Sequence, residues 1–226
     1  MIRMKKTEST MRLTDRDMQT IDLVFWARAV RADQLRIGAG YSLTSLSPYK
    51  RRLTLLTQQR YLDTLPRGNV NEPAIYVLTR RSTAGKQLML QRWGEEAVKR
   101  QLSRRPESLD HLLAINDVRV RMSRACLDLG FTLTEWHSSG ELAPRLQPYQ
   151  LIPDAFWQIV RRVGDKTITS SFFLEVERLS RDLTVLRKKL TKYGELYYSG
   201  DFAKLFGSKA LRLLVVSSLL GITLVV

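Results

Sequence analysis

Cysteine and histidine are scarce in this chain. Its 226 residues include one cysteine, Cys126, and two histidines, His111 and His137. One thiol cannot form a disulfide within the chain. Two histidines that have no cysteine or histidine nearby at ligand spacing do not make a zinc site. The sequence therefore predicts a reduced, cytoplasmic protein in which Cys126 is a buried core residue.

Long apolar runs and glycine-rich phosphate loops are also missing. The amino terminus, MIRMKK, is charged, and no apolar segment follows that would make it a signal peptide. Residues 213–226 are uncharged, but they fall short of the roughly 20 residues that a membrane-spanning helix requires. They are expected to form two short strands, or one strand and a disordered end, rather than a tail anchor. The lack of a glycine-rich loop argues against P-loop and Rossmann nucleotide binding.

Positive charge is in large and unevenly placed excess. The chain has 37 Lys and Arg against 22 Asp and Glu, a net charge of +15. Residues 1–106 hold 21 of these basic residues and 9 of the acidic ones, whereas residues 107–226 hold 16 and 13. A module that binds a polyanion needs such a surplus. An anionic membrane is a weaker explanation, because no Lys-rich amphipathic helix with Trp or Phe opposite is present.

The hydrophobic pattern of residues 14–78 predicts three short helices followed by a β-hairpin. The first helix begins at Thr14, and Asp17 follows three residues later, as in a capping box. The second helix is short, and the third begins at Ser47, a good N-cap residue. A turn-rich segment and an apolar strand at 75–78 complete the hairpin. This order is typical of a winged helix-turn-helix, which places its third helix in the DNA major groove.

The third helix has two different faces. Tyr49, Leu53 and Leu56 form its apolar stripe, and the opposite face is basic and polar. Such a face can meet phosphates and base edges. The predicted contacts to double-stranded DNA, which require no cofactor, are Ser47, Lys50, Arg51, Thr54, Gln58 and, near the wing tip, Arg67. The alternatives are a plain three-helix bundle with solvated cations and a winged helix that binds protein.

The chain is predicted to contain two domains after a flexible basic arm at residues 1–13. Residues 14–106 form the winged helix and a trailing basic helix, and Pro106 breaks that helix. Residues 107–226 form an α/β domain with a mixed sheet, because helical and strand patterns alternate along them. Its predicted elements are a helix at 109–130, strands at 131–136 and 170–177, a helix at 184–198, and a strand at 211–217; the apolar stretch at 151–157 and residues 158–162 lie between the first two strands. The fold class is α/β, or α+β for the whole chain.

Seven segments occur along the chain in this order: LTDRDMQTIDLV (13–24), SPYKRRLTLLTQQRYL (47–62), YVLT (76–79), HLLAINDVRVRM (111–122), LIPDAFWQI (151–159), FFLEVER (172–178) and KKLTKYGELY (188–197). Together they make the chain similar to the replication-relaxation family of plasmid and mobile-element proteins. The resemblance covers most of the chain and implies an amino-terminal winged helix and a role in plasmid DNA replication and relaxation.

Acidic residues follow a pattern in the second domain: Asp154 ends an apolar stretch, and Glu175 and Glu177 share one face of a strand. These residues are similar to those of the PD-(D/E)xK nuclease core, a restriction-endonuclease-like fold. The resemblance implies that Asp154 and Glu175 would bind Mg²⁺. Glu177 stands where that motif has a lysine, so Lys188 or Lys189 would have to replace it.

Two other interpretations of these residues stay open. The carboxylates could pair with Arg178, Arg181 or Lys188 and hold sheet and helix together in an inactive nuclease-like scaffold. An unrelated α/β domain is the remaining alternative. Two histidines also exclude a relaxase whose metal site needs three.

The sequence thus favours a cytoplasmic DNA-binding protein of a plasmid or mobile element over an enzyme. Its winged helix would dock on duplex DNA, and its second domain would recruit a relaxase, a replication protein or a second protomer. The alternatives are a Mg²⁺-dependent nuclease and a transcriptional repressor whose second domain only dimerises.

Overall fold

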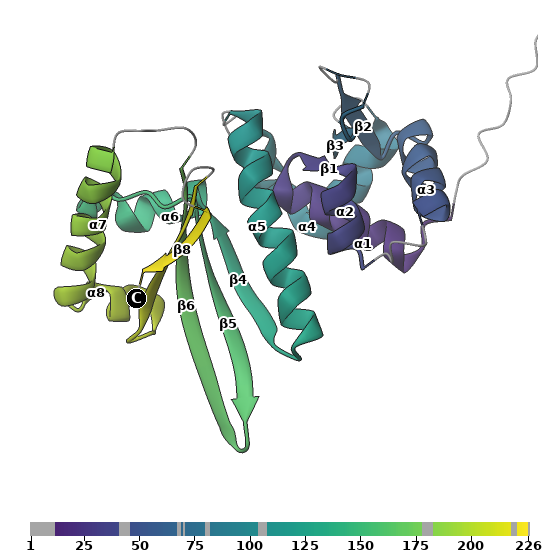
Figure 1. Cartoon of the computed structure of the whole chain (residues 1–226). Coiled ribbons are helices and arrows are strands. Elements are labelled where there is room, and N and C mark those ends of the chain that lie inside the picture. Colours follow the sequence, from purple (N-terminus) through teal and green to yellow (C-terminus); the bar gives the residue numbers. More distant parts are fainter. Residues whose placement is uncertain are drawn as a thin grey trace, which may run out of the picture. The chain divides into compact units, whose positions relative to one another are not determined.

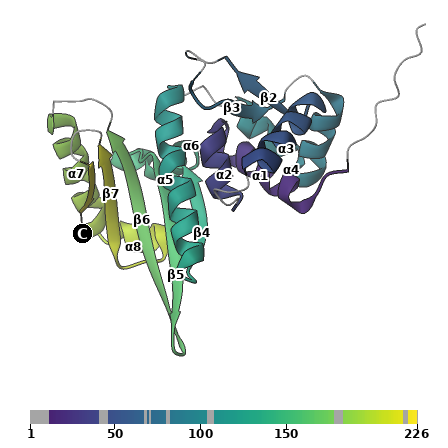
Figure 2. The same ribbon diagram turned by 45° about the vertical axis from the view of Figure 1, so that its right-hand side comes forward.

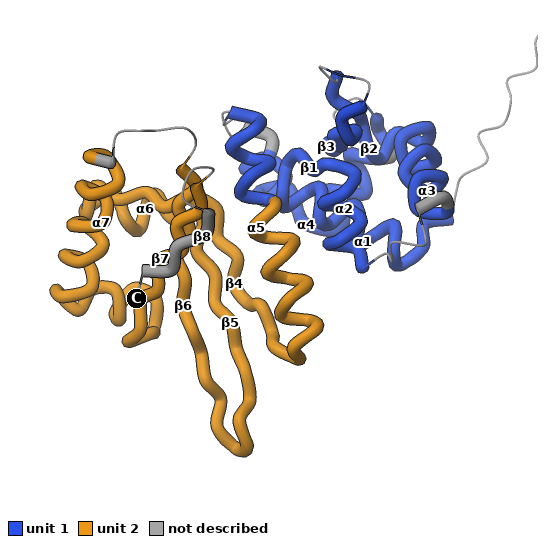
Figure 3. The backbone as a smooth tube through the Cα atoms, in the orientation of Figure 1, with its two compact units in different colours: residues 1–116 blue, residues 117–226 orange. Residues whose placement is uncertain are grey.

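The chain separates into two compact units, residues 1–116 and residues 117–226, in a computed structural model (Figure 3). The structure describes residues 12–40, 46–66, 69, 71–79, 82–103, 108–177, 183–217 and 221–225. The division falls within helix α5 (Leu109–Asp128). The predicted boundary, Pro106, and nearly all of the predicted basic arm lie outside the described residues.

Unit 1 begins with helix α1 (Asp15–Ala27), and the predicted capping box is confirmed at its start. The Thr14 N–H donates to Asp17 Oδ2 at 2.7 Å, and the Asp17 N–H donates to Thr14 Oγ1 at 3.3 Å. These bonds satisfy backbone donors that the first helical turn leaves without a partner. The apolar face of α1 is then buried at Ile21 and Val24.

The other elements of unit 1 follow in the predicted order of helices and hairpin. The three strands form one antiparallel sheet in the order β1-β3-β2. Helix α3 begins one residue before Ser47, so Ser47 lies in its first turn rather than at the N-cap. The elements are β1 (Val30–Arg31), α2 (Ala32–Gly38), α3 (Leu46–Gln58), β2 (Leu62–Leu65), β3 (Ile75–Leu78) and α4 (Thr83–Ser103).

A tight turn joins α1 to β1, and a buried side chain from α5 holds it. Arg28 has φ 67° and ψ −46°, and the Ala29 N–H donates to the Ala27 carbonyl at 2.8 Å. This is a γ-turn of the rare, positive-φ kind. Asn116 is buried, and its Nδ2 donates to the Ala27 and Ala29 carbonyls at 3.0 and 2.8 Å. Asn116 therefore fixes a strained turn that sets the path from helix to strand.

Unit 2 is built around a five-stranded sheet in the order β4-β5-β6-β7-β8 (Figure 1). Strands β6 and β7 are parallel, and the other neighbours are antiparallel. The prediction of a mixed sheet is confirmed. The elements are β4 (Thr132–Ser138), α6 (Ser139–Leu146), the 3-10 helix η2 (Gln147–Tyr149), β5 (Ala155–Val163), β6 (Lys166–Glu177), α7 (Leu183–Tyr198), α8 (Asp201–Phe206), β7 (Leu211–Ser217) and β8 (Gly221–Val225).

The sequence did not predict helices α6 and α8. Serine, glycine and proline are frequent in residues 138–148, and this composition favours a polar loop after β4. Instead, the Ser138 N–H donates to Glu141 Oε2 at 2.8 Å, which is a capping interaction, and α6 follows. Leu142 and Leu146 are completely buried, so packing against the sheet stabilises a helix that contains Pro144.

The two faces of the unit 2 sheet have different partners. Phe156 and Phe173 project into a core shared with α6, α7 and α8. Figures 1 and 2 show α7 and the carboxyl-terminal part of α5 on opposite sides of this sheet. On the α5 side, Trp136, Trp157 and Phe172 stack across three strands, with ring centroids 5.1 and 5.4 Å apart.

Candidate functional site

The exposed face of α3 carries most of the side chains that the sequence predicts to contact DNA. Lys50, Arg51, Thr54 and Gln58 are all exposed. The predicted buried stripe is confirmed, because the exposed fractions of Tyr49, Leu53 and Leu56 are 2%, 1% and 1%. Arg67 and the side chain of Ser47 lie outside the described residues.

The three consecutive cations of α3 have different roles. Arg52 forms a bidentate ion pair with Asp17 of α1, whose side chain is buried. Burial raises the pKa of Asp17, but hydrogen bonds from Arg52 and Thr14 outweigh this and lower it below its ordinary value. Lys50 and Arg51 form no ion pair with any described residue. Arg52 thus fixes α3 to α1, and its two neighbours remain available to an external anion.

The hydroxyl of Thr54 has a hydrogen-bond partner within α3 when no ligand is bound. Its hydroxyl donates to the Lys50 carbonyl at 3.0 Å, one turn earlier on the same helix. A threonine hydroxyl retains two acceptor positions when its proton is used in this way. Thr54 can therefore accept a hydrogen bond from a base or offer its methyl group without breaking this contact.

The acidic residues of unit 2 meet a lysine and a tyrosine from α7. Glu175 on β6 is 1% exposed. Lys189 Nζ donates to its Oε2 at 2.6 Å, and the Tyr193 hydroxyl donates to its Oε1 at 2.7 Å. Asp154, just before β5, accepts a hydrogen bond at 2.7 Å from the backbone N–H of Val176. These contacts join the start of β5, the carboxyl-terminal end of β6 and the crossover helix α7.

Burial dominates the electrostatics of this acidic cluster. It raises the pKa of Glu175 to about 7, and the nearby Asp154 charge adds to the rise while Lys189 and Tyr193 oppose it. Burial lowers the pKa of Lys189, but attraction to Glu175 outweighs this and raises it. Burial and Glu175 together hold the pKa of the Tyr193 phenol well above its ordinary value. Glu175 therefore gains or loses its proton near neutral pH.

The structure selects one of the two lysines that the sequence suggested. Lys188 is exposed, and Lys189 is the residue that reaches Glu175. Glu177 is partly exposed near this cluster, and it contributes to the raised pKa of Lys189. Arg178 and Arg181, the other suggested partners, lie outside the described residues.

The cluster does not fit a Mg²⁺ site as it stands. Both carboxylate oxygens of Glu175 accept hydrogen bonds from side chains, and its raised pKa favours the neutral form, which is a poor ligand. No three His, Cys, Asp or Glu side chains come together for a metal ion in the part of the chain that the structure describes. The contacts instead fit a buried network that fastens α7 to the sheet.

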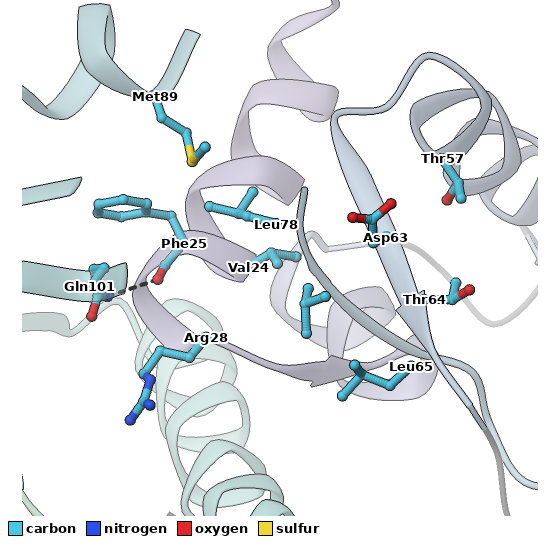
Figure 4. Close-up of a pocket in the computed structure, with 11 residues that line it drawn as sticks. Val24, Phe25, Arg28, Thr57, Asp63, Thr64, Leu65, Leu78, Met89 and Gln101 are labelled. Carbon is cyan, nitrogen blue, oxygen red and sulfur yellow. Dashed lines mark hydrogen bonds between the residues drawn. The ribbon is translucent and has the colours of Figure 1, made fainter. Parts of the chain in front are cut away.

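Unit 1 also contains a pocket of about 550 Å³, which the sequence did not predict (Figure 4). Its lining comes from α1, α3, β2, β3 and α4, and it mixes apolar residues such as Phe25 and Met89 with polar Asp63 and Gln101. Gln101 Nε2 donates to the Phe25 carbonyl at 2.8 Å. The Gln101 Oε1 atom is buried without a hydrogen-bond partner, so it is open to a donor from water or a ligand.

A family model described as replication-relaxation matches residues 27–207, which is most of the chain. The chain belongs to this family. Membership of the replication-relaxation family indicates a role in the replication or relaxation of plasmids or other mobile elements. The match runs from the end of α1 through α8, so it includes both α3 and the acidic cluster.

Two further comparisons find nothing comparable. No curated protein and no solved structure matches the chain significantly.

Within the described residues, no helix combines the length and apolarity that are needed to cross a bilayer.

Proposed function

We propose that this member of the replication-relaxation family binds duplex DNA through unit 1, with α3 as the recognition helix of a winged helix. Three helices and a three-stranded sheet follow one another in the order that this module requires. The strong positive charge of residues 1–106 supports the same proposal, because DNA affinity depends mainly on neutralised phosphates.

The observation that carries the proposal is the unpaired basic face of α3. Lys50 and Arg51 are exposed and have no acidic partner among the described residues, whereas the adjacent Arg52 is tied to Asp17. A lysine here can hold a phosphate, and an arginine can also make two hydrogen bonds to guanine. Gln58, one turn after Thr54, adds a side chain that can pair with adenine.

Unit 2 has the role of recruiting a partner in this proposal: a relaxase, a replication protein or a second protomer. The end of α5 supports it, because Leu127 and Leu129 are 69% and 65% exposed. Exposed apolar side chains that lie together can form part of a surface that another protein covers.

Arg51→Ala tests the DNA-binding proposal directly. Affinity for a labelled random-sequence duplex is measured by fluorescence anisotropy over a range of salt concentrations, and Lys86→Ala on α4 is the matched control because Lys86 is also exposed. One lost phosphate contact should weaken binding and flatten the slope of log K against log salt by about 1. Equal affinity and slope for Arg51→Ala and the intact protein would refute the assignment of α3.

A Mg²⁺-dependent nuclease is the second candidate, and one observation favours it. Asp154, Glu175 and Lys189 converge in a unit where α5, β4, β5, β6, α7 and β7 have the order of the PD-(D/E)xK core, with α6 inserted after β4 and α8 after α7. The protein is incubated with supercoiled plasmid in Mg²⁺, Mn²⁺ or EDTA, and the DNA is run before and after the protein is stripped. Metal-dependent nicking that Asp154→Asn and Glu175→Gln abolish would establish the enzyme. Intact supercoil would leave a binding protein.

A transcriptional repressor whose unit 2 only dimerises is the remaining alternative. Footprinting over the promoter of its own gene distinguishes it from a replication or relaxation protein. Protection confined to that promoter would favour the repressor.

A further inference from the structure

The hairpin that joins β5 to β6 extends past the rest of unit 2. We call its outer part, residues 160–169, the arm. Figures 1 and 2 both show it projecting beyond the end of α5 and beyond the other strands. Both strands are exposed from Arg161 to Thr169, and they stay paired up to Val163 and Lys166. The arm is therefore a regular two-stranded ribbon and not a loose loop.

The root of the arm is held firmly. Trp157 and Phe172 are register partners, and their rings stack with an interplanar angle of 7°. Trp136 stacks on Trp157 from the neighbouring strand, and Arg119 and Arg212 lie over the outer rings of this stack. Stacked aromatic and cation–π contacts of this kind fix the direction in which a ribbon leaves its sheet.

The arm is basic, and its cations are unpaired. Arg161, Arg162 and Lys166 are exposed, and none of them forms an ion pair with any residue that the structure describes. Asp165 is the only acidic residue in the arm. Elsewhere, three exposed cations have an acidic neighbour: Arg92 has Asp22, Arg124 has Asp128 and Lys204 has Asp201. Unpaired cations at the end of a projecting element suit a polyanion.

One face of the arm combines charge with apolar groups. Strand alternation and register place Arg161, Val163, Lys166 and Ile168 on the same face. The exposed fractions of Val163 and Ile168 are 53% and 37%. Apolar side chains of this size can contact thymine methyl groups or wedge between base steps while adjacent cations hold the phosphates.

The dimensions of the arm also suit a groove of DNA. Three residue pairs lie beyond Val160, which is about 10 Å at the usual rise of a strand. The major groove is about 8.5 Å deep and admits a two-stranded ribbon. The tip can therefore reach base edges while the root stays outside the groove.

We propose that the arm is a second DNA contact, a β-ribbon that enters a groove of duplex DNA. This proposal rests on the proposed function and adds an element of unit 2 to it. Charge favours DNA over a second copy of this chain as the partner of the arm. The arm's cations have no acidic partner among the described residues, and a phosphate backbone would supply one. A second copy of this chain has a net charge of +15, so it offers less negative charge to the arm than DNA does.

The test compares two triple variants in the duplex anisotropy assay. Arg161→Ala/Arg162→Ala/Lys166→Ala removes the cations of the arm. The matched control, Arg145→Ala/Arg187→Ala/Lys209→Ala, removes three exposed cations of unit 2 that lie outside it. The arm variant should lose about tenfold in affinity and about 2–3 in salt slope, and the control should change little. All six side chains are exposed, so thermal unfolding should be unaffected, which excludes misfolding as the cause.

The possible outcomes separate the arm from α3. Equal effects of the two triple variants, or none from the arm variant while Arg51→Ala weakens binding, would overturn the arm proposal alone. Failure of the intact protein to bind any duplex would overturn the proposed function as well. Val163→Ser/Ile168→Ser should lower affinity without changing the salt slope. If it instead changes the oligomeric state in solution and leaves DNA binding intact, the arm contacts a second copy and the proposal is wrong.

Discussion

The proton equilibrium of Glu175 gives the sharpest prediction about unit 2. Its carboxyl group is 1% exposed, and burial raises its pKa from an ordinary 4.5 to about 7. Between these two values, the folded protein holds a proton on Glu175 that the unfolded chain has lost. The contribution of this group to stability is therefore complete below pH 4.5 and declines as pH rises toward 7.

The size of this decline follows from the shift. One pKa unit corresponds to about 1.4 kcal/mol, so a rise from 4.5 to about 7 corresponds to about 3 kcal/mol of unfolding free energy. That is a large part of the roughly 5–15 kcal/mol that stabilises a typical domain. The raised pKa of Lys189 does not cancel the decline, since Lys189 keeps its charge throughout this pH range in both states.

The assay is urea unfolding of the intact protein and of Glu175→Gln between pH 4.5 and 7.5. Glutamine imitates the neutral carboxyl and cannot titrate, so the stability difference between the two proteins isolates Glu175. Intact protein should lose about 3 kcal/mol relative to the variant across this range. Carbon-13 NMR of the labelled glutamate carboxyl groups should show one that titrates near pH 7.

Two results would refute this reasoning. A stability difference that stays constant with pH, or no glutamate that titrates above its ordinary range, would mean that Glu175 is not desolvated as the structure has it. Titration in the presence of Mg²⁺ also tests the nuclease candidate. A bound cation would favour the ionised carboxyl and lower the pKa of Glu175, whereas in a buried network without a metal site Glu175 would titrate as before.

Three further predictions concern unit 1, and each is checked by chemical unfolding. For the Arg52–Asp17 pair, the pH dependence of stability is measured as well. Asn116→Ala should cost about 2–3 kcal/mol, because it removes a buried donor to two carbonyls; a change below about 0.5 kcal/mol would contradict that role. Arg52→Ala should cost about 3–5 kcal/mol by leaving the buried Asp17 carboxylate without its cation. Because the pKa of Asp17 is lowered in the folded protein, the stability that its carboxylate contributes is lost as pH falls through that pKa. This acid sensitivity of stability should be smaller in Arg52→Ala, and an unchanged acid transition would argue against the ion pair. Gly85→Ala should cost about 1–3 kcal/mol because its Cβ would lie 2.9 Å from the Arg60 carbonyl oxygen; an unchanged midpoint would show that the backbone yields there.

Local patterns were sufficient to locate most helices and strands. The capping box at Thr14 and the apolar stripe of α3 each depend on residues within a few positions of one another, and both are confirmed. Strand β7 (Leu211–Ser217) has its predicted bounds. Helix α6 was missed because its Ser, Gly and Pro residues favour loops locally. The burial of Leu142 and Leu146 against the sheet overrides that preference.

The candidate DNA-contacting residues of α3 also depend partly on local pattern and partly on tertiary contacts. The sequence selected Lys50, Arg51, Thr54 and Gln58 because helical periodicity alone places them opposite the buried stripe, and all four are exposed. Periodicity could not show that Arg52 is tied to Asp17, a residue 35 positions away. The separation of available cations from structural cations on α3 is thus a result of tertiary packing.

What the sequence determined by itself is most of the helices and strands, the mixed sheet, the excess of positive charge and the face that α3 presents. Each of these depends on composition or on neighbours within a turn or two. Only the tertiary structure decided that Lys189 rather than Lys188 reaches Glu175, that Tyr193 completes its hydrogen bonds, and that Asn116 fixes a turn almost ninety residues away in the chain. Those contacts depend on sheet register and on the crossover path of α7, which local spacing does not encode.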